Sequence, residues 1–125
     1  MPKVLGLGGL FFKSADPAAM REWYGRVLGL PFEEWGMVFS PEDAAAQPGA
    51  GTVFSPFSAA TDYFEPSDKE FMFNLMVDDL DGMLARCAEH GVTPVKTFPE
   101  EANGSFAHIM DPEGRKIELW QPKPM

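Results

Sequence analysis

A carboxylate and a histidine, Glu118 and His108, fall on the two arms of one predicted hairpin near the end of the chain. Residues 111–114 read Asp-Pro-Glu-Gly, in which proline sets φ early in the turn and glycine supplies a positive φ late. If Met110 pairs with Lys116 across this turn, His108 lies directly opposite Glu118 on one face of a sheet. Such a pair can move a proton, with the carboxylate as general base, or can hold a polar ligand. A solvent-facing His–Glu pair on a sheet surface explains the same spacing, so both interpretations stay open at this point.

The strand after the turn places a cation and an indole beside this acid. Side chains alternate along a strand, so Ile117 and Leu119 face one side of the sheet. Lys116, Glu118 and Trp120 face the other side. One face of the hairpin is therefore apolar, and the opposite face carries the groups that could do chemistry.

The bulk composition restricts the class of protein. The chain has 125 residues, the size of one domain, and its 45% hydrophobic and 23% charged residues are ordinary for a globular protein. A net charge of −9 without a basic cluster argues against a nucleic acid as partner. No apolar run approaches the ~20 residues needed to span a bilayer, and no signal-peptide core precedes Lys13. Because Cys87 is the single cysteine, no internal disulfide can form, and we expect a cytoplasmic protein without a membrane partner.

The chain reads as two similar halves. In the first, a strand is expected at 4–12, and Asp16 and Pro17 open a helix that Gly29 ends. Further strands are expected at 31–40 and 52–58, with a turn-rich loop at 41–51 that could enclose a short strand. The helix buries apolar residues at helical spacing, namely Met20, Trp23, Tyr24 and Val27.

The second half repeats this order. A strand is expected at 71–77, Asp78-Asp79 caps a helix that closes at His90 and Gly91, and a strand at 92–98 precedes the hairpin at 105–121. The helix carries an apolar stripe of Leu80, Met83, Leu84 and Cys87. A pattern that recurs after half the chain suggests a duplicated module, although similar helix caps could also arise by coincidence. We expect one domain, 1–125, with modules at about 4–60 and 70–121 and a polar connector at about 59–69.

Three parts of the sequence together resemble one superfamily. They are Trp-Tyr-Gly-Arg-Val-Leu-Gly-Leu at 23–30, Val-Asp-Asp-Leu-Asp at 77–81 and Asp-Pro-Glu-Gly-Arg-Lys-Ile-Glu-Leu-Trp at 111–120. Over residues 4–121 the chain resembles the vicinal-oxygen-chelate superfamily, which includes glyoxalase I, bleomycin-resistance proteins, fosfomycin-resistance proteins and extradiol dioxygenases. The resemblance implies an α+β fold in which two βαβββ modules form an open, barrel-like eight-stranded mixed sheet around a cavity. It also implies a homodimer, with the modules paired within one chain or across two.

Metal-binding members of this superfamily draw their ligands from four strands, and most of those positions lack a ligand here. The resemblance places them at Gly9, near Phe54, at Met72 and at Glu118. Of these only Glu118 suits a hard divalent cation, because a thioether is too soft for such an ion. We therefore predict no functional metal, or at most a weak site at Glu118 and His108.

The resemblance and the strand alternation together predict a cavity with apolar and aromatic walls. Its expected ligand-binding residues are Phe11, Lys13, Phe54, Met72, Asn74, Lys116 and Trp120, beside Glu118 and His108. Eleven phenylalanines and eight methionines also exceed the needs of a small core and fit a cavity or a buried subunit interface.

Three functional interpretations follow, in the order in which the sequence favours them. The first is a glyoxalase-like protein that binds a small, partly apolar or aromatic molecule without a metal. The second is a metal-independent or weakly metal-assisted lyase or isomerase, with Glu118 as general base and His108 orienting it or shuttling the proton. The third is a structural module in which His108 satisfies a buried Glu118 and side chains fill the cavity.

Overall fold

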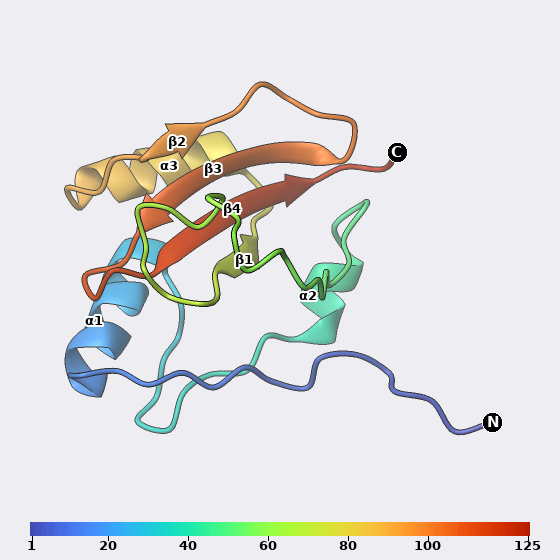
Figure 1. The fold of residues 1–125 in the computed structure, drawn as a ribbon, viewed down its shortest axis with the longest axis horizontal. Coiled ribbons are helices and arrows are strands. Elements are labelled where there is room, and N and C mark those ends of the chain that lie inside the picture. The colour runs from blue at the N-terminus through green and yellow to red at the C-terminus, as the bar shows by residue number, and fades with distance from the viewer.

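The computed structural model describes all 125 residues and confirms the α+β class (Figure 1). The elements in chain order are α1 (Pro17–Leu28), α2 (Pro41–Ala45), β1 (Phe73–Met76), α3 (Leu80–Glu89), β2 (Lys96–Thr97), β3 (Gly104–Met110) and β4 (Lys116–Pro122). The strands form one open, mixed four-stranded sheet in the order β1-β4-β3-β2. β1 runs parallel to β4, and the other neighbours are antiparallel. None of the helices is long and apolar enough to cross a bilayer.

The core lies where α1 and α3 cover one face of this sheet. Ile109, Ile117 and Leu119 are fully buried in a cluster that contains apolar residues from both helices, including Val27 and Cys87. Side chains alternate along a strand, so the neighbours of these core residues project from the opposite face of the sheet. These neighbours are His108, Glu118 and Trp120. The apolar stripe of the hairpin thus anchors the sheet, and its polar stripe faces away from the helices.

Local sequence signals set the ends of both longer helices, as expected. Asp16 accepts a hydrogen bond from the backbone N–H of Ala19 at 3.1 Å, and Asp79 accepts one from Gly82 at 3.0 Å. Gly29 ends α1 in the left-handed conformation, with φ of 74°, which a residue without Cβ adopts at little cost. α1 is further tied to α3 by Arg86, whose guanidinium donates to the backbone oxygens of Val27 and Arg26 at 3.0 and 3.1 Å.

The first half differs from the expectation, because its expected strands at 4–12, 31–40 and 52–58 join no ladder. Only an isolated bridge between Glu33 and Gly36 occurs there. The expected loop at 41–51 begins with the short helix α2, which proline at its first turn and Glu42 and Asp43 favour. In the second half, the strand expected at 92–98 is reduced to β2. An apolar sequence favours an extended backbone but does not itself supply the edge with which a strand must pair.

The unpaired first-half segments leave large apolar side chains uncovered. Phe11 is 96% exposed and Phe54 is 88% exposed. In Figure 1 the N-terminal segment runs apart from the sheet, which contains only β1, β4, β3 and β2. The eight-stranded arrangement of two modules therefore stays a prediction.

Candidate functional site

Glu118 lies at the centre of the polar face of the sheet because β4 has a neighbour on each side. Across the sheet it is paired with Asn74 of β1 and His108 of β3. Its Oε2 lies 2.8 Å from His108 Nε2 and accepts a hydrogen bond from the Tyr63 hydroxyl. Its Oε1 accepts a hydrogen bond from Asn74 Nδ2 at 2.7 Å. The pairing of His108 with Glu118 and of Met110 with Lys116 confirms the predicted hairpin register.

These donors control the charge of Glu118. Its side chain is only 12% exposed, and burial raises its pKa. Hydrogen bonds from His108, Tyr63 and Asn74 stabilise the carboxylate by more, so the pKa lies below its usual value. Glu118 is therefore ionised at neutral pH. A carboxylate offers about four lone-pair directions, so one direction, on Oε1, stays open to a further donor.

His108 is fully buried and is oriented by the same contact. Because Nε2 faces an ionised carboxylate, Nε2 carries the proton in the neutral ring and Nδ1 is left as an acceptor. Nδ1 is buried without a hydrogen-bond partner. The rings of Tyr63 and Phe98 meet His108 edge-on, with centroids 5.2 and 4.8 Å away. Of the two interpretations that the spacing left open, the solvent-facing pair is therefore wrong, since His108 is fully buried.

Lys116 has a different task from the ligand contact that we expected. Its Nζ donates to the backbone oxygens of Tyr63 at 2.8 Å and Glu65 at 2.7 Å, so it holds the connector against the sheet. Burial lowers its pKa, as does the nearby cation of Lys96. Tyr63 was not predicted, since its only signal is an aromatic pair with Phe64 within an otherwise polar connector.

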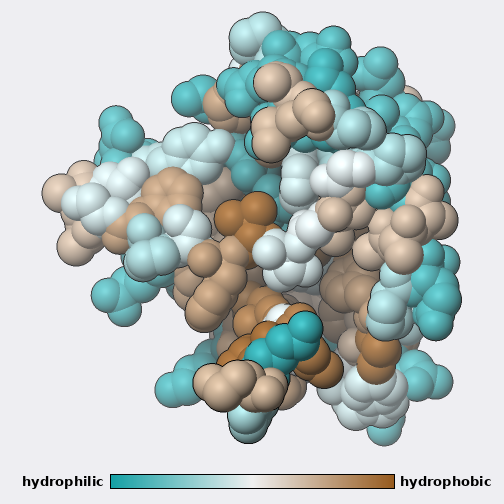
Figure 2. Space-filling view, turned by 90° about the vertical axis from the view of Figure 1, so that its right-hand side faces the viewer, coloured by the Kyte–Doolittle hydropathy of each residue, from teal (hydrophilic) through white to brown (hydrophobic).

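Aromatic side chains extend this face beyond Glu118. Phe106 and Trp120 are cross-strand partners whose rings are almost parallel, at 2°, with centroids 6.0 Å apart. The Trp120 indole N–H donates to the backbone oxygen of Asn103 at 3.0 Å, which fixes the ring. Together with Glu118 and Asn74 they line a cleft of about 2310 Å³ between the sheet and the first-half segments. Figure 2 shows hydrophobic residues gathered around a hollow on one side of the molecule.

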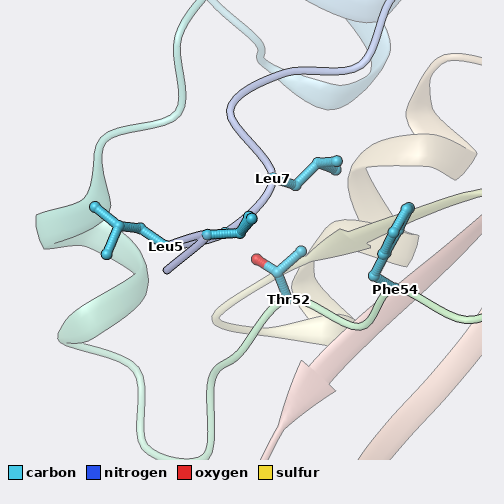
Figure 3. A pocket seen from close by; sticks show the side chains of 6 residues that line it. Leu5, Leu7, Thr52 and Phe54 are labelled. Carbon is cyan, nitrogen blue, oxygen red and sulfur yellow. The ribbon is translucent and has the colours of Figure 1, made fainter. Parts of the chain in front are cut away.

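The expected ligand-binding residues are only partly brought together. Met72, Phe11 and Phe54 also line the wide cleft, the last two from the unpaired first-half segments. Phe54 additionally lines a separate apolar pocket of about 300 Å³ with Thr52, Leu5 and Leu7 (Figure 3). Lys13 is not among the residues that line either cavity, and its backbone oxygen accepts a hydrogen bond from Arg115.

The turn of the hairpin is fixed by a buried polar cluster on Asp111. Its Oδ2 accepts hydrogen bonds from Arg115 at 2.9 Å and from the Tyr24 hydroxyl at 2.7 Å. Arg115 also binds Glu113 at 2.7 Å, and Glu113 accepts a bond from the Ser14 hydroxyl at 2.9 Å. This cluster joins the turn to α1 and to the chain before it.

The donor set does not fit the divalent metal that the superfamily resemblance implies. Gly9, Phe54 and Met72 supply no hard ligand, and no three His, Cys, Asp or Glu side chains lie close enough together to hold an ion. Glu118 is hydrogen-bonded to His108, and its carboxylate oxygens also accept hydrogen bonds from Tyr63 and Asn74. These lone pairs are therefore not free to bind a metal ion.

Comparison with known proteins agrees with this architecture. A family model described as Glyoxalase-like domain matches residues 9–120. The crystal structure of TnmS3, an antibiotic binding protein from Streptomyces sp. CB03234, aligns with a TM-score of 0.53 and 23% sequence identity over 87% of this chain and 88% of TnmS3. At that identity the similarity shows a common fold. No curated protein matches the chain. Since the family model spans nearly the whole sequence, this chain belongs to the glyoxalase-like family of the vicinal-oxygen-chelate superfamily.

Proposed function

We propose that the chain binds a small, planar, partly apolar molecule in the cleft above β3 and β4. The observation that carries this proposal is the parallel pair Phe106 and Trp120 beside an ionised, mostly buried Glu118. Flat aromatic faces favour a planar ligand, and a few fixed polar groups orient it. TnmS3, which has the same fold, is described as an antibiotic binding protein, and this supports a binding function by analogy.

Glu118 determines what the ligand has to supply. Its one remaining lone-pair direction accepts a hydrogen bond and cannot donate one. A ligand that reaches it therefore brings an N–H or O–H group, and a cation gains further from the carboxylate charge and from the aromatic faces. The net charge of −9 also favours the approach of a cation.

A pair of probes tests this proposal. 9-Aminoacridine is a planar cation with an amino donor, whereas acridine has the same ring system without that donor. In calorimetric titrations Glu118→Gln should weaken 9-aminoacridine binding by about tenfold or more, since a charge-assisted hydrogen bond is lost, and should change acridine binding little. Phe106→Leu should weaken both probes. Equal binding of 9-aminoacridine to the wild type and to Glu118→Gln would contradict the role of Glu118.

A lyase or isomerase reaction with Glu118 as general base is the second candidate, and the buried His108 at 2.8 Å from it is the observation in its favour. A lowered pKa makes the carboxylate a weak base, which favours binding over catalysis. The same Glu118→Gln variant separates the two. A catalyst loses turnover while it keeps much of its substrate affinity, and a binding protein loses affinity for donors.

We further propose that the protein is a cytoplasmic homodimer that completes the eight-stranded arrangement. Segments 4–12 and 52–58 carry exposed Val4, Phe11, Val53 and Phe54, and β1 is an open sheet edge. Unpaired apolar strands of this kind are stabilised by pairing with another edge. Light scattering coupled to gel filtration should give about twice the chain mass of 13.8 kDa. A monomer at micromolar concentration would contradict the dimer. The buried, free Cys87 suits the reducing cytoplasm.

A further inference from the structure

Within the connector, residues 61–67 form a strap across the polar face of the sheet, and Tyr63 lies at its centre. The Tyr63 hydroxyl donates to Glu118 Oε2, the same oxygen that His108 contacts. Tyr63 and Glu118 both line the cleft. The strap therefore occupies one of the positions through which a ligand could reach the carboxylate.

The surroundings of Tyr63 form a site shaped for a phenol. His108 meets the ring edge-on, at 5.2 Å between centroids and 85° between planes. Phe57 packs against it at 5.6 Å and 31°. The Lys116 ammonium lies 5.5 Å from the ring centroid. The site thus offers an acceptor for the hydroxyl, aromatic walls for the ring and a cation near the ring face.

Only a few polar contacts join the strap to the sheet. Besides the bond to Glu118, Lys116 binds the Tyr63 and Glu65 backbone oxygens at 2.8 and 2.7 Å. The backbone bonds inside the strap are local turns, from Glu65 to Asp62 at 3.0 Å and from Ser67 to Phe64 at 2.9 Å. No ladder ties the strap to a strand, so the tyrosine can leave Glu118 while its turns stay intact.

From these contacts we propose that Tyr63 occupies the position of the ligand in the free protein. The cleft then binds hydroxylated planar aromatic molecules, whose phenolic hydroxyl replaces that of Tyr63 on Glu118. The inference rests on the proposed binding function and names the ligand class for the same site. Binding then differs from simple filling of a cleft, because the incoming hydroxyl releases the strap. The oxygen of Glu118 exchanges one O–H donor for another, so no buried lone pair is left unmatched.

The test uses 2-naphthol and its methyl ether, 2-methoxynaphthalene, which has the same rings but no donor. Amide hydrogen exchange is followed over residues 61–69 of the full chain, with and without each probe at saturation. Exchange there should become faster by about threefold or more with 2-naphthol, although ligands commonly slow exchange, because the strap leaves the sheet. The methyl ether should not accelerate it. Slower or unchanged exchange with bound 2-naphthol would overturn the proposal.

The binding affinities of two Tyr63 variants provide a second readout beside amide exchange. Tyr63→Ala vacates the phenol-shaped space, so 2-naphthol should bind about tenfold tighter than to the wild type while the methyl ether gains little. Tyr63→Phe keeps the ring and removes only the hydroxyl, and it should give a smaller gain for 2-naphthol. Tyr24→Phe is the matched control, since it deletes another tyrosine–carboxylate bond, to Asp111, and should leave 2-naphthol affinity unchanged.

The outcomes distinguish this inference from the proposed function. If 9-aminoacridine binds and Tyr63→Ala gains no affinity for 2-naphthol, the strap inference is wrong and the binding function stands. If 2-naphthol binds Tyr63→Ala but not the wild type, the strap occupies a phenol site that this compound alone cannot open, and the proposed displacement is wrong. If neither probe series binds any of the proteins, both proposals fail.

Discussion

Replacing Glu118 by glutamine tests whether one ionised side chain organises the polar face of the sheet. The carboxylate accepts side-chain hydrogen bonds from Tyr63, His108 and Asn74. Glutamine has nearly the same shape but only one acceptor oxygen, and its NH₂ group faces at least one of these donors. The substitution therefore keeps the packing and removes the charge and part of the hydrogen bonding.

The expected loss of stability follows from these contacts. A hydrogen bond to a charged group contributes about 1.5–3 kcal/mol, and a neutral one about half as much. Losing one bond and converting two others to neutral bonds would cost about 3–6 kcal/mol, but a neutral amide is also cheaper to bury than a carboxylate, so the free energy of unfolding falls by about 2–4 kcal/mol. For a chain of this size that corresponds to a fall in Tm of roughly 5–15 °C.

The pH dependence of the unfolding free energy gives a second test of the role of Glu118. The folded-state pKa of Glu118 lies below its usual value, so its stabilisation is fully present above the unfolded pKa of about 4.3. That stabilisation is lost as the pH falls through the folded-state pKa. The difference in unfolding free energy between the wild type and Glu118→Gln should thus shrink as the pH falls below about 4.

Urea titrations at one protein concentration measure both effects, with Glu22→Gln as control because Glu22 forms only an exposed pair with Arg26. The control should change the unfolding free energy by about 0.5 kcal/mol or less. A Glu118→Gln protein as stable as the wild type at pH 7, or a difference that grows below about pH 4, would show that the carboxylate does not stabilise the folded chain.

Further predictions concern the frame around the site. Asp111→Asn removes one of the two carboxylates that pair with the buried Arg115, Glu113 being the other, and should lower the unfolding free energy by about 2–3 kcal/mol in urea titration, whereas a loss below about 1 kcal/mol would argue against a structural ion pair. Lys116→Met should leave the sheet folded by circular dichroism but speed amide exchange in residues 61–67, and unchanged exchange there would show that the lysine does not hold the strap. Gly29→Ala places a Cβ at φ 74° and should lower Tm by a few degrees, for a cost of about 1 kcal/mol; an unchanged Tm would indicate that α1 ends differently.

The sequence predicted α1, α3 and the hairpin because their signals are local, whereas the short helix α2 lies where a loop was expected. Asp16 and Asp79 cap the helices that follow them, and Gly29 ends α1. The Asp-Pro-Glu-Gly turn sets the register of β3 on β4, and from this register the His108–Glu118 contact follows directly. Each of these features depends on residues within one turn or one pair of adjacent strands.

Other features depend on partners that are distant in the sequence, and these could not be predicted. Segments 4–12 and 52–58 have strand-like composition, but an extended segment becomes a strand only where a free edge meets it. Tyr63 reaches Glu118 across the chain, from a connector whose path no periodicity describes. For the same reason Lys116, which alternation places on the site face, binds carbonyl groups of that connector and not the cleft.

The central claim is that a planar molecule binds on the aromatic pair with its donor at Glu118, and NMR titration tests it most directly. Three tryptophans give three indole signals, of which Trp120 lies in the cleft and Trp23 lies in the core. On addition of 9-aminoacridine we expect saturable shifts of the Trp120 indole and the Asn74 side-chain amide, with the Trp23 indole unmoved. Binding that leaves both Trp120 and Asn74 unshifted would contradict it.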